Sequence, residues 1–170
     1  MNPDLGPRTF STDSVIEFVV TDPDAPEALR CLASYFAELD KRFGGGGAAS
    51  ASPAGRSDLF RPPAGVFLVV VCSDESVGCV GLKLHGDGPA EIKRMWLDAR
   101  MRGLGIGRRL LAEVERRAVE AGARSIRLET NRALHEAITL YRSAGFVAVE
   151  AFNDEKCADH WFEKPLRPSK

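Results

Sequence analysis

The sequence predicts a mixed α/β fold, with antiparallel hairpins in the first half and β-α-β connections in the second. Short β-favouring runs alternate with three amphipathic stretches, and glycines mark most of the junctions. The predicted order of elements is β-α-loop-β-β-β-α-β-α-β-β. A chain of 170 residues with 44% hydrophobic residues is long enough to bury one substantial core. We therefore expect a single domain over residues 1–170, with its core at about residues 15–164.

The first half of the chain begins with a strand and a helix. Val15–Val20 is a β-favouring run, and Ala25–Phe43 carries apolar residues at helical spacing. Asp24 is suited to cap this helix, and Pro26 suits its first turn. Residues 44–53 are only glycine, alanine, serine and proline, so they predict a flexible surface loop within the domain.

Three strands are predicted next, two of them paired as a hairpin. Val66–Cys72 is a continuous apolar run typical of a buried strand, and a short polar turn separates it from Val77–Leu84. A second turn leads into a third strand, Ala90–Leu97.

The second half alternates helices and strands. A glycine-rich turn precedes a helix that runs to about Ala121, where Gly122 is placed to stop it. Asn131 is suited to cap the next helix, Arg132–Ala144. The remaining strands are predicted at Ser125–Thr130, Phe146–Ala151 and Asp159–Glu163.

Composition narrows the classes of function. A net charge of −1 argues against general nucleic-acid binding, which needs a basic surface. No apolar run approaches the roughly 20 residues that span a bilayer, and the N-terminus lacks the pattern of a signal peptide. The 4 cysteines and 3 histidines form no metal-ligand spacing. We expect a cytoplasmic protein with reduced thiols, no bound metal, and neither a membrane nor a nucleic acid as partner.

The most informative segment is the turn Arg102–Gly107, which lies between a predicted strand and a predicted helix. Such a turn leaves backbone N–H groups directed at one point, and the helix dipole adds positive charge there. Glycine permits positive φ and lets a phosphate approach the backbone closely. The sequence therefore predicts a phosphate-binding turn.

Two common nucleotide sites fit this turn poorly. A P-loop requires Lys-Ser or Lys-Thr after its glycines, and neither follows here. In a dinucleotide-binding turn the third glycine comes one position later than Gly107, and the turn occurs early in a βαβ unit, whereas four predicted strands precede this one.

A third pattern fits better. Arg102-x-x-Gly105-x-Gly107, after a strand and opening a long helix, resembles the coenzyme A turn of the GNAT N-acetyltransferases. The resemblance extends through Val77–Gly81, Leu128–Asn131 and Ala137–Phe146, where a tyrosine precedes Gly-Phe. It implies a mixed, mostly antiparallel central sheet flanked by about four helices. It also implies that acetyl-CoA is the co-substrate.

The resemblance implies which residues hold acetyl-CoA. Its pyrophosphate would lie on the backbone amides of Arg102, Gly103, Leu104, Gly105, Ile106, Gly107 and Arg108, with added charge from the two arginine side chains. Its pantetheine arm would follow the backbone of Met95, Trp96 and Leu97 as a peptide joins a sheet edge. Asn131 would contact the cofactor arm, although capping explains this residue equally well, and Trp96 also suits the core.

The same resemblance implies two catalytic residues. Glu91 stands where many relatives carry a general base, and it would take the proton that an alkyl amine holds at pH 7; an exposed carboxylate or a partner for Lys93 explains it as well. Tyr141 would donate a proton to the leaving thiolate, with core packing as the alternative. A backbone N–H of Met95 or Trp96 would stabilise the oxyanion. Cys157 and His160 lack spaced partners, so we expect direct transfer without an acyl-enzyme.

The acceptor is set in this fold by the first helix, the loop after it and the late strands. These segments carry Tyr35, Glu38, Asp40, Arg42, Phe43, Asp154, Glu155, Asp159 and Trp161. The carboxylates and aromatic residues among them suit a cationic amine. We expect a small primary amine as acceptor. The alternatives are a protein lysine or N-terminal amine, and a non-catalytic acetyl-CoA-binding module. Dimerisation is common in the family, and the sequence leaves the oligomeric state open.

Overall fold

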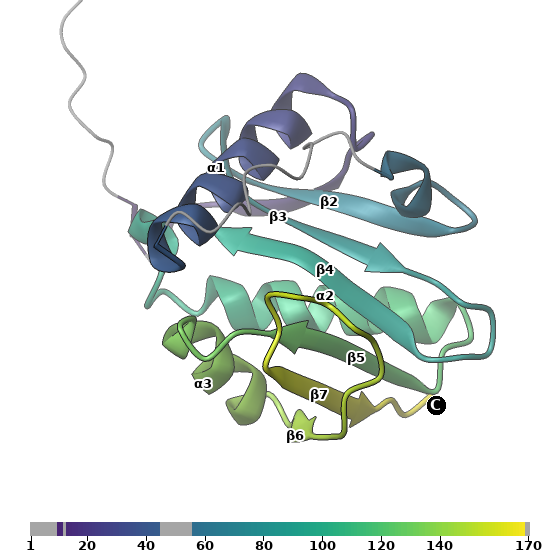
Figure 1. Ribbon diagram of the computed structural model, residues 1–170. Coiled ribbons are helices and arrows are strands. Elements are labelled where there is room, and N and C mark those ends of the chain that lie inside the picture. Colours follow the sequence, from purple (N-terminus) through teal and green to yellow (C-terminus); the bar gives the residue numbers. More distant parts are fainter. Residues whose placement is uncertain (1–9, 12, 45–55, 169–170) are drawn as a thin grey trace, which may run out of the picture.

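A computed structural model describes residues 10–11, 13–44 and 56–168 of the chain. Within them lie three α-helices, two 3₁₀ helices (η2 and η3) and seven strands (Figure 1). In chain order the elements are β1 Ile16–Val20, α1 Pro26–Arg42, η2 Ser57–Phe60, β2 Gly65–Cys72, β3 Glu75–Lys83, β4 Ala90–Leu97, η3 Ala99–Met101, α2 Ile106–Glu120, β5 Ser125–Thr130, α3 His135–Ser143, β6 Val147–Ala148 and β7 His160–Pro165. The loop predicted at residues 44–53 lies outside the described residues, except for Gly44.

The strands form one sheet in the order β1-β2-β3-β4-β5-β7-β6. Every neighbouring pair is antiparallel except β4 and β5. This confirms the predicted mixed α/β class with a mostly antiparallel sheet. No helix in the described part of the chain is both long and apolar enough to cross a membrane.

The helices cover both faces of the sheet. This arrangement explains why the sequence of β2 is apolar throughout. Phe67 and Val69 pack with Leu32 of α1, in a cluster on one face. Leu68 and Val70 belong to the larger cluster that includes the apolar side of α2 on the other face. Successive residues of a strand point to opposite faces, so a strand covered on both sides needs apolar residues at every position.

The two middle strands separate soon after they meet. β4 and β5 pair only at Ala90 with Ile126 and at Glu91 with Arg127. Beyond this point the ribbons of β4 and β5 diverge, and α3 lies beside the opening (Figure 1). The later residues of β4 therefore pair with β3 on one side only, which leaves a free strand edge inside the molecule.

Local details differ from the prediction at three places. Asp24 does not cap α1, because its carboxylate pairs with Arg61 at 2.6 Å, and the helix begins after Ala25 without a side-chain cap. Asn131 caps a turn instead of α3: its side-chain oxygen accepts the amide of Ala133 at 2.9 Å. As a result α3 begins only at His135. The strand predicted at residues 146–151 is reduced to β6, Val147–Ala148.

Candidate active site

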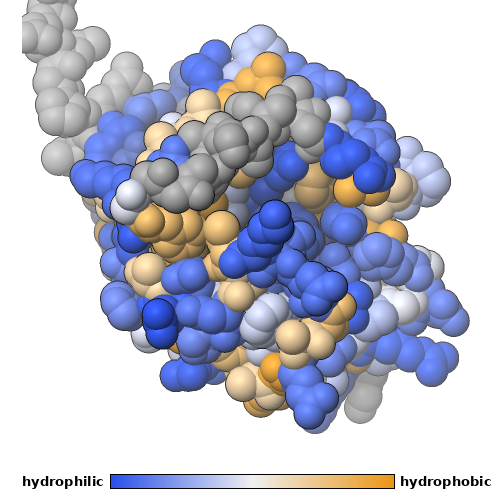
Figure 2. Space-filling view, viewed as in Figure 1, coloured by the Kyte–Doolittle hydropathy of each residue, from blue (hydrophilic) through white to orange (hydrophobic). Residues whose placement is uncertain are grey.

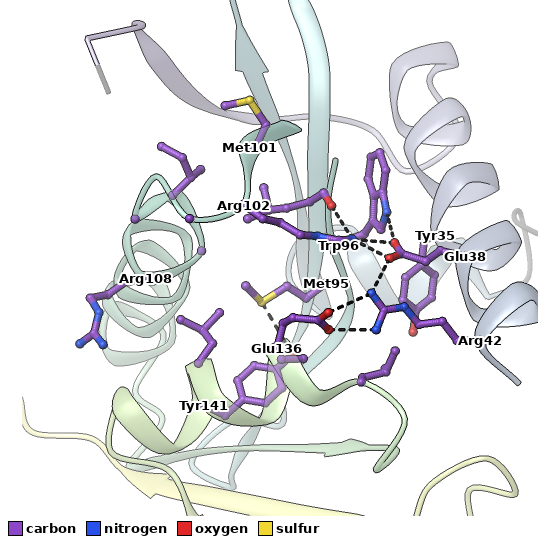
Figure 3. A pocket seen from close by; sticks show the side chains of 18 of the residues that line it. Tyr35, Glu38, Arg42, Met95, Trp96, Met101, Arg102, Arg108, Glu136 and Tyr141 are labelled. Atoms are coloured by element: carbon purple, nitrogen blue, oxygen red, sulfur yellow. Dashed lines mark hydrogen bonds and ion pairs between the residues drawn. The ribbon is translucent and has the colours of Figure 1, made fainter. Parts of the chain in front are cut away.

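A cavity of about 360 Å³ opens where β4 and β5 diverge (Figure 3). It is enclosed by α1, the end of β4, the glycine turn, the start of α2 and α3. Most of the predicted cofactor residues line it, namely Met95, Trp96, Leu97, Arg102, Gly103, Gly105, Ile106, Gly107, Arg108 and Tyr141. Leu104 does not line this cavity and packs against the main core instead. Asn131 lines a second, neighbouring cavity.

The glycine turn has the backbone conformation that its sequence predicts. Gly103 and Gly105 have φ angles of 78° and 77°, a region that side chains disfavour. The helix α2 begins directly after Gly105 without a side-chain cap, so its first amides need an external acceptor. Gly107 lies close to α3, since a Cβ there would approach the Cδ2 atom of Leu140 to 2.9 Å and the leucine side chain would have to move. The turn thus presents uncapped amides and the positive end of a helix dipole to the cavity.

The two arginines of the turn point in different directions (Figure 3). Arg102 faces α1, where one of its nitrogens lies 2.7 and 2.8 Å from the two oxygens of Glu38. Arg108 points away from the cavity and donates to the hydroxyl of Ser143 at 2.8 Å. Each guanidinium therefore has a protein partner in this structure. A phosphate that binds one of them would have to share it with that partner or displace the partner.

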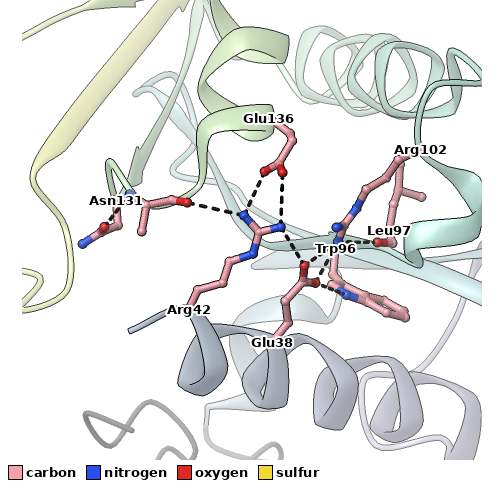
Figure 4. A network of polar contacts seen from close by, with 8 residues as sticks. Glu38, Arg42, Trp96, Leu97, Arg102, Asn131 and Glu136 are labelled. Carbon is pink, nitrogen blue, oxygen red and sulfur yellow. Dashed lines mark hydrogen bonds and ion pairs between the residues drawn. The ribbon is translucent and has the colours of Figure 1, made fainter. Parts of the chain in front are cut away.

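Glu38 joins three elements around the cavity (Figure 4). Besides Arg102, it accepts the indole N–H of Trp96 at 2.7 Å and pairs with Arg42 at 3.2 Å. Arg42 in turn pairs with Glu136 at 2.9 Å. This network links α1 to the glycine turn and to α3, so it holds the cavity walls at a defined separation. Glu38 and Arg42 thus line this cavity, and neither of them lines the second one described below.

Tyr141 lies at the inner end of the cavity, on α3. Only 6% of it is exposed, and its ring packs edge-to-face against Phe146. Its hydroxyl group lies 3.9 Å from the Met95 sulfur of β4. Burial, aided by the charge of Glu129, raises the pKa of Tyr141 well above its ordinary value. The phenol therefore stays protonated at neutral pH, as proton donation requires.

A second cavity, of about 440 Å³, adjoins the first. Both are lined by Tyr141 and Met95, together with Tyr35, Leu39, Leu134 and Ala137. On the surface, a hydrophobic patch lies between the C-terminal end of α1 and α3, bordered by hydrophilic side chains (Figure 2). Tyr141 thus lies at the boundary of two compartments, one beside the glycine turn and one beside η2 and β5.

Glu91 lies outside both cavities, at the point where β4 and β5 pair. Its side chain is 8% exposed and pairs with Arg127 at 2.7 Å, with Lys83 at 3.5 Å and with Lys93 at 4.0 Å. Burial would raise the pKa of Glu91, but the hydrogen bond from Arg127 and the nearby lysine charges outweigh it and lower the pKa. A carboxylate in these surroundings is a weak base.

Glu129 of β5 is a carboxylate that the sequence analysis did not single out. It lines the second cavity, and its charge acts on the Tyr141 phenol. One carboxylate oxygen pairs with Lys93, and the other is buried with no hydrogen-bond partner among the described residues. Buried carboxylate oxygens normally have partners, so the missing partner of this oxygen distinguishes Glu129 from Glu91. The signal was present in the string Leu128–Asn131, but spacing alone did not reveal which way Glu129 points.

Arg94 of β4 also lines the second cavity. The strand carries a bulge here, since Gly81 of β3 pairs with Lys93 while Cys79 pairs with Trp96. Arg94 has a φ of 55°, which costs a non-glycine residue about 1–2 kcal/mol. Such bulges redirect side chains and are frequent beside active sites.

The other residues considered from the sequence lie at the edge of this region. Cys157 is exposed and lines the second cavity, and the Nδ1 atom of His160 lies 2.8 Å from the carboxylate of Asp159. The side-chain amide of Asn131 donates to the carbonyl of Cys157 at 2.8 Å. Its amide nitrogen and its oxygen both have protein partners, which accounts for Asn131 structurally.

The residues around the first cavity fit acetyl-CoA. The uncapped amides of α2 suit a pyrophosphate, and the free edge of β4 suits the amide groups of a pantetheine arm. Within the described residues no group of three or more histidine, cysteine or acidic side chains is suited to a metal.

The sequence profile of the acetyltransferase (GNAT) family matches residues 32–146, more than half of the chain. This chain belongs to the GNAT acetyltransferase family. The match confirms the family that the sequence resembles.

Relatives of the GNAT chain are similar in sequence and in fold. Over 81 residues it is 41% identical to an IAA acetyltransferase of Azospirillum brasilense. The aligned region covers 47% of this chain and 53% of that protein. Over 97 residues it is 34% identical to an uncharacterized N-acetyltransferase of Schizosaccharomyces pombe. This aligned region covers 55% of this chain and 58% of that protein. The chain thus spans about half the length of the curated relatives it matches. The crystal structure of a GNAT acetyltransferase from Staphylococcus aureus has the same fold, with a TM-score of 0.75, 18% identity and coverage of 90% and 100% of the two chains.

Proposed function

We propose that this protein is an acetyl-CoA-dependent N-acetyltransferase that acts on a small primary amine. The observation that carries the proposal is the meeting of two cavities at Tyr141 and Met95. The first cavity provides the amides for a pyrophosphate, and the second, of about 440 Å³, has the size of a small-molecule site. A thioester and an amine bound in these cavities would meet beside the Tyr141 hydroxyl.

The acetyl donor binds in the first cavity. Its pyrophosphate accepts hydrogen bonds from the turn between Arg102 and Arg108, and the helix dipole of α2 stabilises the negative charge. Its pantetheine arm lies along Met95–Leu97, where β4 has lost β5 as a neighbour. Acetyl-CoA supplies an acetyl group activated as a thioester.

The reaction forms a C–N bond and breaks a C–S bond. The amine nitrogen must lose a proton, and the departing sulfur must gain one. The amine attacks the thioester carbonyl carbon, and a carboxylate takes the proton that the nitrogen loses. A backbone N–H of Met95 or Trp96 stabilises the carbonyl oxygen as it becomes negative. Tyr141 donates its proton to the departing thiolate and regains one from solvent.

Glu129 is better suited than Glu91 to accept the amine proton. Glu129 lines the acceptor cavity and has a carboxylate oxygen with no partner among the described residues, whereas Glu91 is bound by Arg127 and has a lowered pKa. Glu91 then has a positioning role, because it pairs with Lys93, the residue that holds Glu129.

Calorimetric titration with acetyl-CoA tests the donor site. The wild-type chain should bind with micromolar affinity, and Gly105→Glu, which adds a negative side chain at a positive-φ position, should lose binding at least 10-fold. Absence of wild-type binding would refute the proposal.

Thiol release with a library of amines then tests catalysis. A pair of isosteric variants separates the two carboxylates. Glu129→Gln should lower kcat/KM about 100-fold at neutral pH, and Glu91→Gln should lower it far less. The reverse order would restore Glu91 as the base. Acetyl-CoA binding with no turnover of any amine or peptide would indicate a non-catalytic binding module, and turnover of peptides alone would indicate a protein acetyltransferase.

A further inference from the structure

The second cavity, which the proposed function assigns to the acceptor, is lined by more basic than acidic side chains. Among the described residues its charged lining consists of Arg56, Lys83, Lys93, Arg94, Glu129 and Glu155. Glu129 pairs with Lys93, so these two charges compensate each other within the cavity. Of the acidic residues that the sequence suggested for a cationic acceptor, only Glu155 lines the cavity. The other carboxylates that the sequence suggested for a cationic amine therefore do not line this cavity.

Arg94 is a basic residue of this cavity that is held between aromatic rings. Its guanidinium carbon lies 5.8 Å from the ring centre of Phe36 and 5.2 Å from that of Phe60. These contacts with α1 and η2 orient the guanidinium plane. The carbonyl of Arg94 accepts a hydrogen bond from the Cys79 thiol at 3.4 Å, which supports the bulge.

The surroundings of Arg94 favour an anion. Burial beside aromatic rings lowers the pKa of the guanidinium, which reflects the cost of removing its charge from water. A carboxylate recovers this cost, because it forms two parallel charge-assisted hydrogen bonds with a guanidinium. The positive φ of Arg94 is maintained by the surrounding fold, a pattern associated with functional residues.

Arg94 and the proposed proton acceptor belong to different sides of the same cavity. Arg94 packs against Phe36 and Phe60, whereas Glu129 comes from β5 and acts on Tyr141 of α3. An acceptor that lies across β4 can therefore place its amine beside Glu129 and a negative group beside Arg94.

We propose that the acceptor is an amine that also carries a carboxylate, as amino acids do, and that Arg94 binds this carboxylate. The inference rests on the proposed acetyltransferase function and specifies its substrate class. Arg94 determines specificity and takes no part in proton transfer. Polyamines and lysine-rich peptides are poor acceptors, because the cavity lining repels additional positive charge.

Matched acceptors test the inference in the full chain. Thiol release is measured for a series of amino acids, for the amide and the decarboxylated amine of each, and for aminophosphonates of the same skeleton. At least one amino acid should exceed its amide and its decarboxylated amine by 10-fold or more in kcat/KM. Preference for the aminophosphonate would assign a phosphonate-like anion to Arg94 and overturn the carboxylate assignment. Preference for uncharged or polycationic amines would overturn the inference completely.

Substitutions of Arg94 provide the residue-specific test. Arg94→Gln should lower kcat/KM for the preferred amino acid about 10- to 100-fold and leave the decarboxylated amine within about 2-fold. Arg94→Lys keeps the charge without the paired donors. Its kcat/KM for the preferred amino acid should lie between those of the wild type and Arg94→Gln. Arg124→Gln, which removes an exposed arginine at the start of β5, is the control and should match the wild type.

The outcomes separate the two proposals. An equal loss with every acceptor in Arg94→Gln would indicate a structural role and overturn the inference. If Arg94→Gln does not fold, the substrate series on wild type and Arg94→Lys decides the matter. Binding of acetyl-CoA with no turnover of any amino acid would overturn the substrate class alone, whereas no binding of acetyl-CoA would refute the acetyltransferase function.

Discussion

Replacing Tyr141 with phenylalanine separates the chemical role of this side chain from its packing role. The ring contributes to the core through Phe146 and Phe162, with centroid distances of 5.8 and 6.4 Å, and phenylalanine keeps both contacts. The hydroxyl group has one described partner, the Met95 sulfur at 3.9 Å, which is a weak acceptor. Its removal should change the free energy of unfolding by no more than about 0.5 kcal/mol.

The expected effect on catalysis is much larger. A positioned general acid contributes at least about 100-fold to the rate, so Tyr141→Phe should lower kcat by about that factor, or about 2.7 kcal/mol of transition-state free energy. The assay is thiol release at saturating acetyl-CoA, accompanied by calorimetry of acetyl-CoA binding and by thermal unfolding. Binding and Tm should stay close to the wild type.

A donor with a more acidic thiol distinguishes proton donation from a packing effect. An aryl thiolate leaves without prior protonation more readily than an alkyl thiolate, so the deficit of Tyr141→Phe should shrink with an aryl thioester. An unchanged kcat in the variant would refute the assignment of Tyr141 as the general acid. A deficit of equal size with both donors would also refute it.

Three further outcomes follow from the structure. Because burial raises the pKa of Tyr141 above its usual value of about 10, the folded state retains this proton more strongly than the unfolded state. The stability linked to it is therefore complete below about pH 10 and is lost as the pH rises further, so urea midpoints should fall above pH 10 less steeply in Tyr141→Phe than in the wild type. Leu110→Ala, at a fully buried site of α2, should destabilise by about 2–5 kcal/mol in denaturant unfolding, and a loss below 1 kcal/mol would contradict the packing described. Gly107→Val should weaken acetyl-CoA binding, because its side chain would push against Leu140 of α3, and unchanged calorimetry would contradict this account.

The sequence predicted the elements that depend on short-range patterns. The alternation of Ala90–Leu97, the glycines at 103 and 105 and the apolar side of the following helix lie within a few residues of one another. Their conformations follow from local sterics and burial, and the structure has β4, two positive-φ glycines and α2 at these positions. Capping was predicted less well. Asp24 and Asn131 are suitable cap residues, but Arg61 and the turn at Ala133 occupy their carboxylate and amide oxygens.

The arrangement of charged side chains around the second cavity depends on contacts between distant segments. Glu91 and Glu129 are both carboxylates on predicted strands, and nothing in their spacing distinguishes them. The short pairing of β4 with β5 binds Glu91 to Arg127 and leaves Glu129 at the cavity. Likewise, the bulge that directs Arg94 toward Phe36 and Phe60 depends on the register between β3 and β4.

By itself, the sequence determined the mixed α/β class, the family and the positive-φ conformation of the glycine turn, because each depends on residue types at short, regular spacings. Only the tertiary structure decided that the two cavities meet at Tyr141, and that the charged lining of the second cavity is more basic than acidic. Strand register and helix packing bring together residues as far apart as Phe36, Arg94 and Glu129. Charges interact through space, so their chemical effect is set by this assembly and not by their order along the chain.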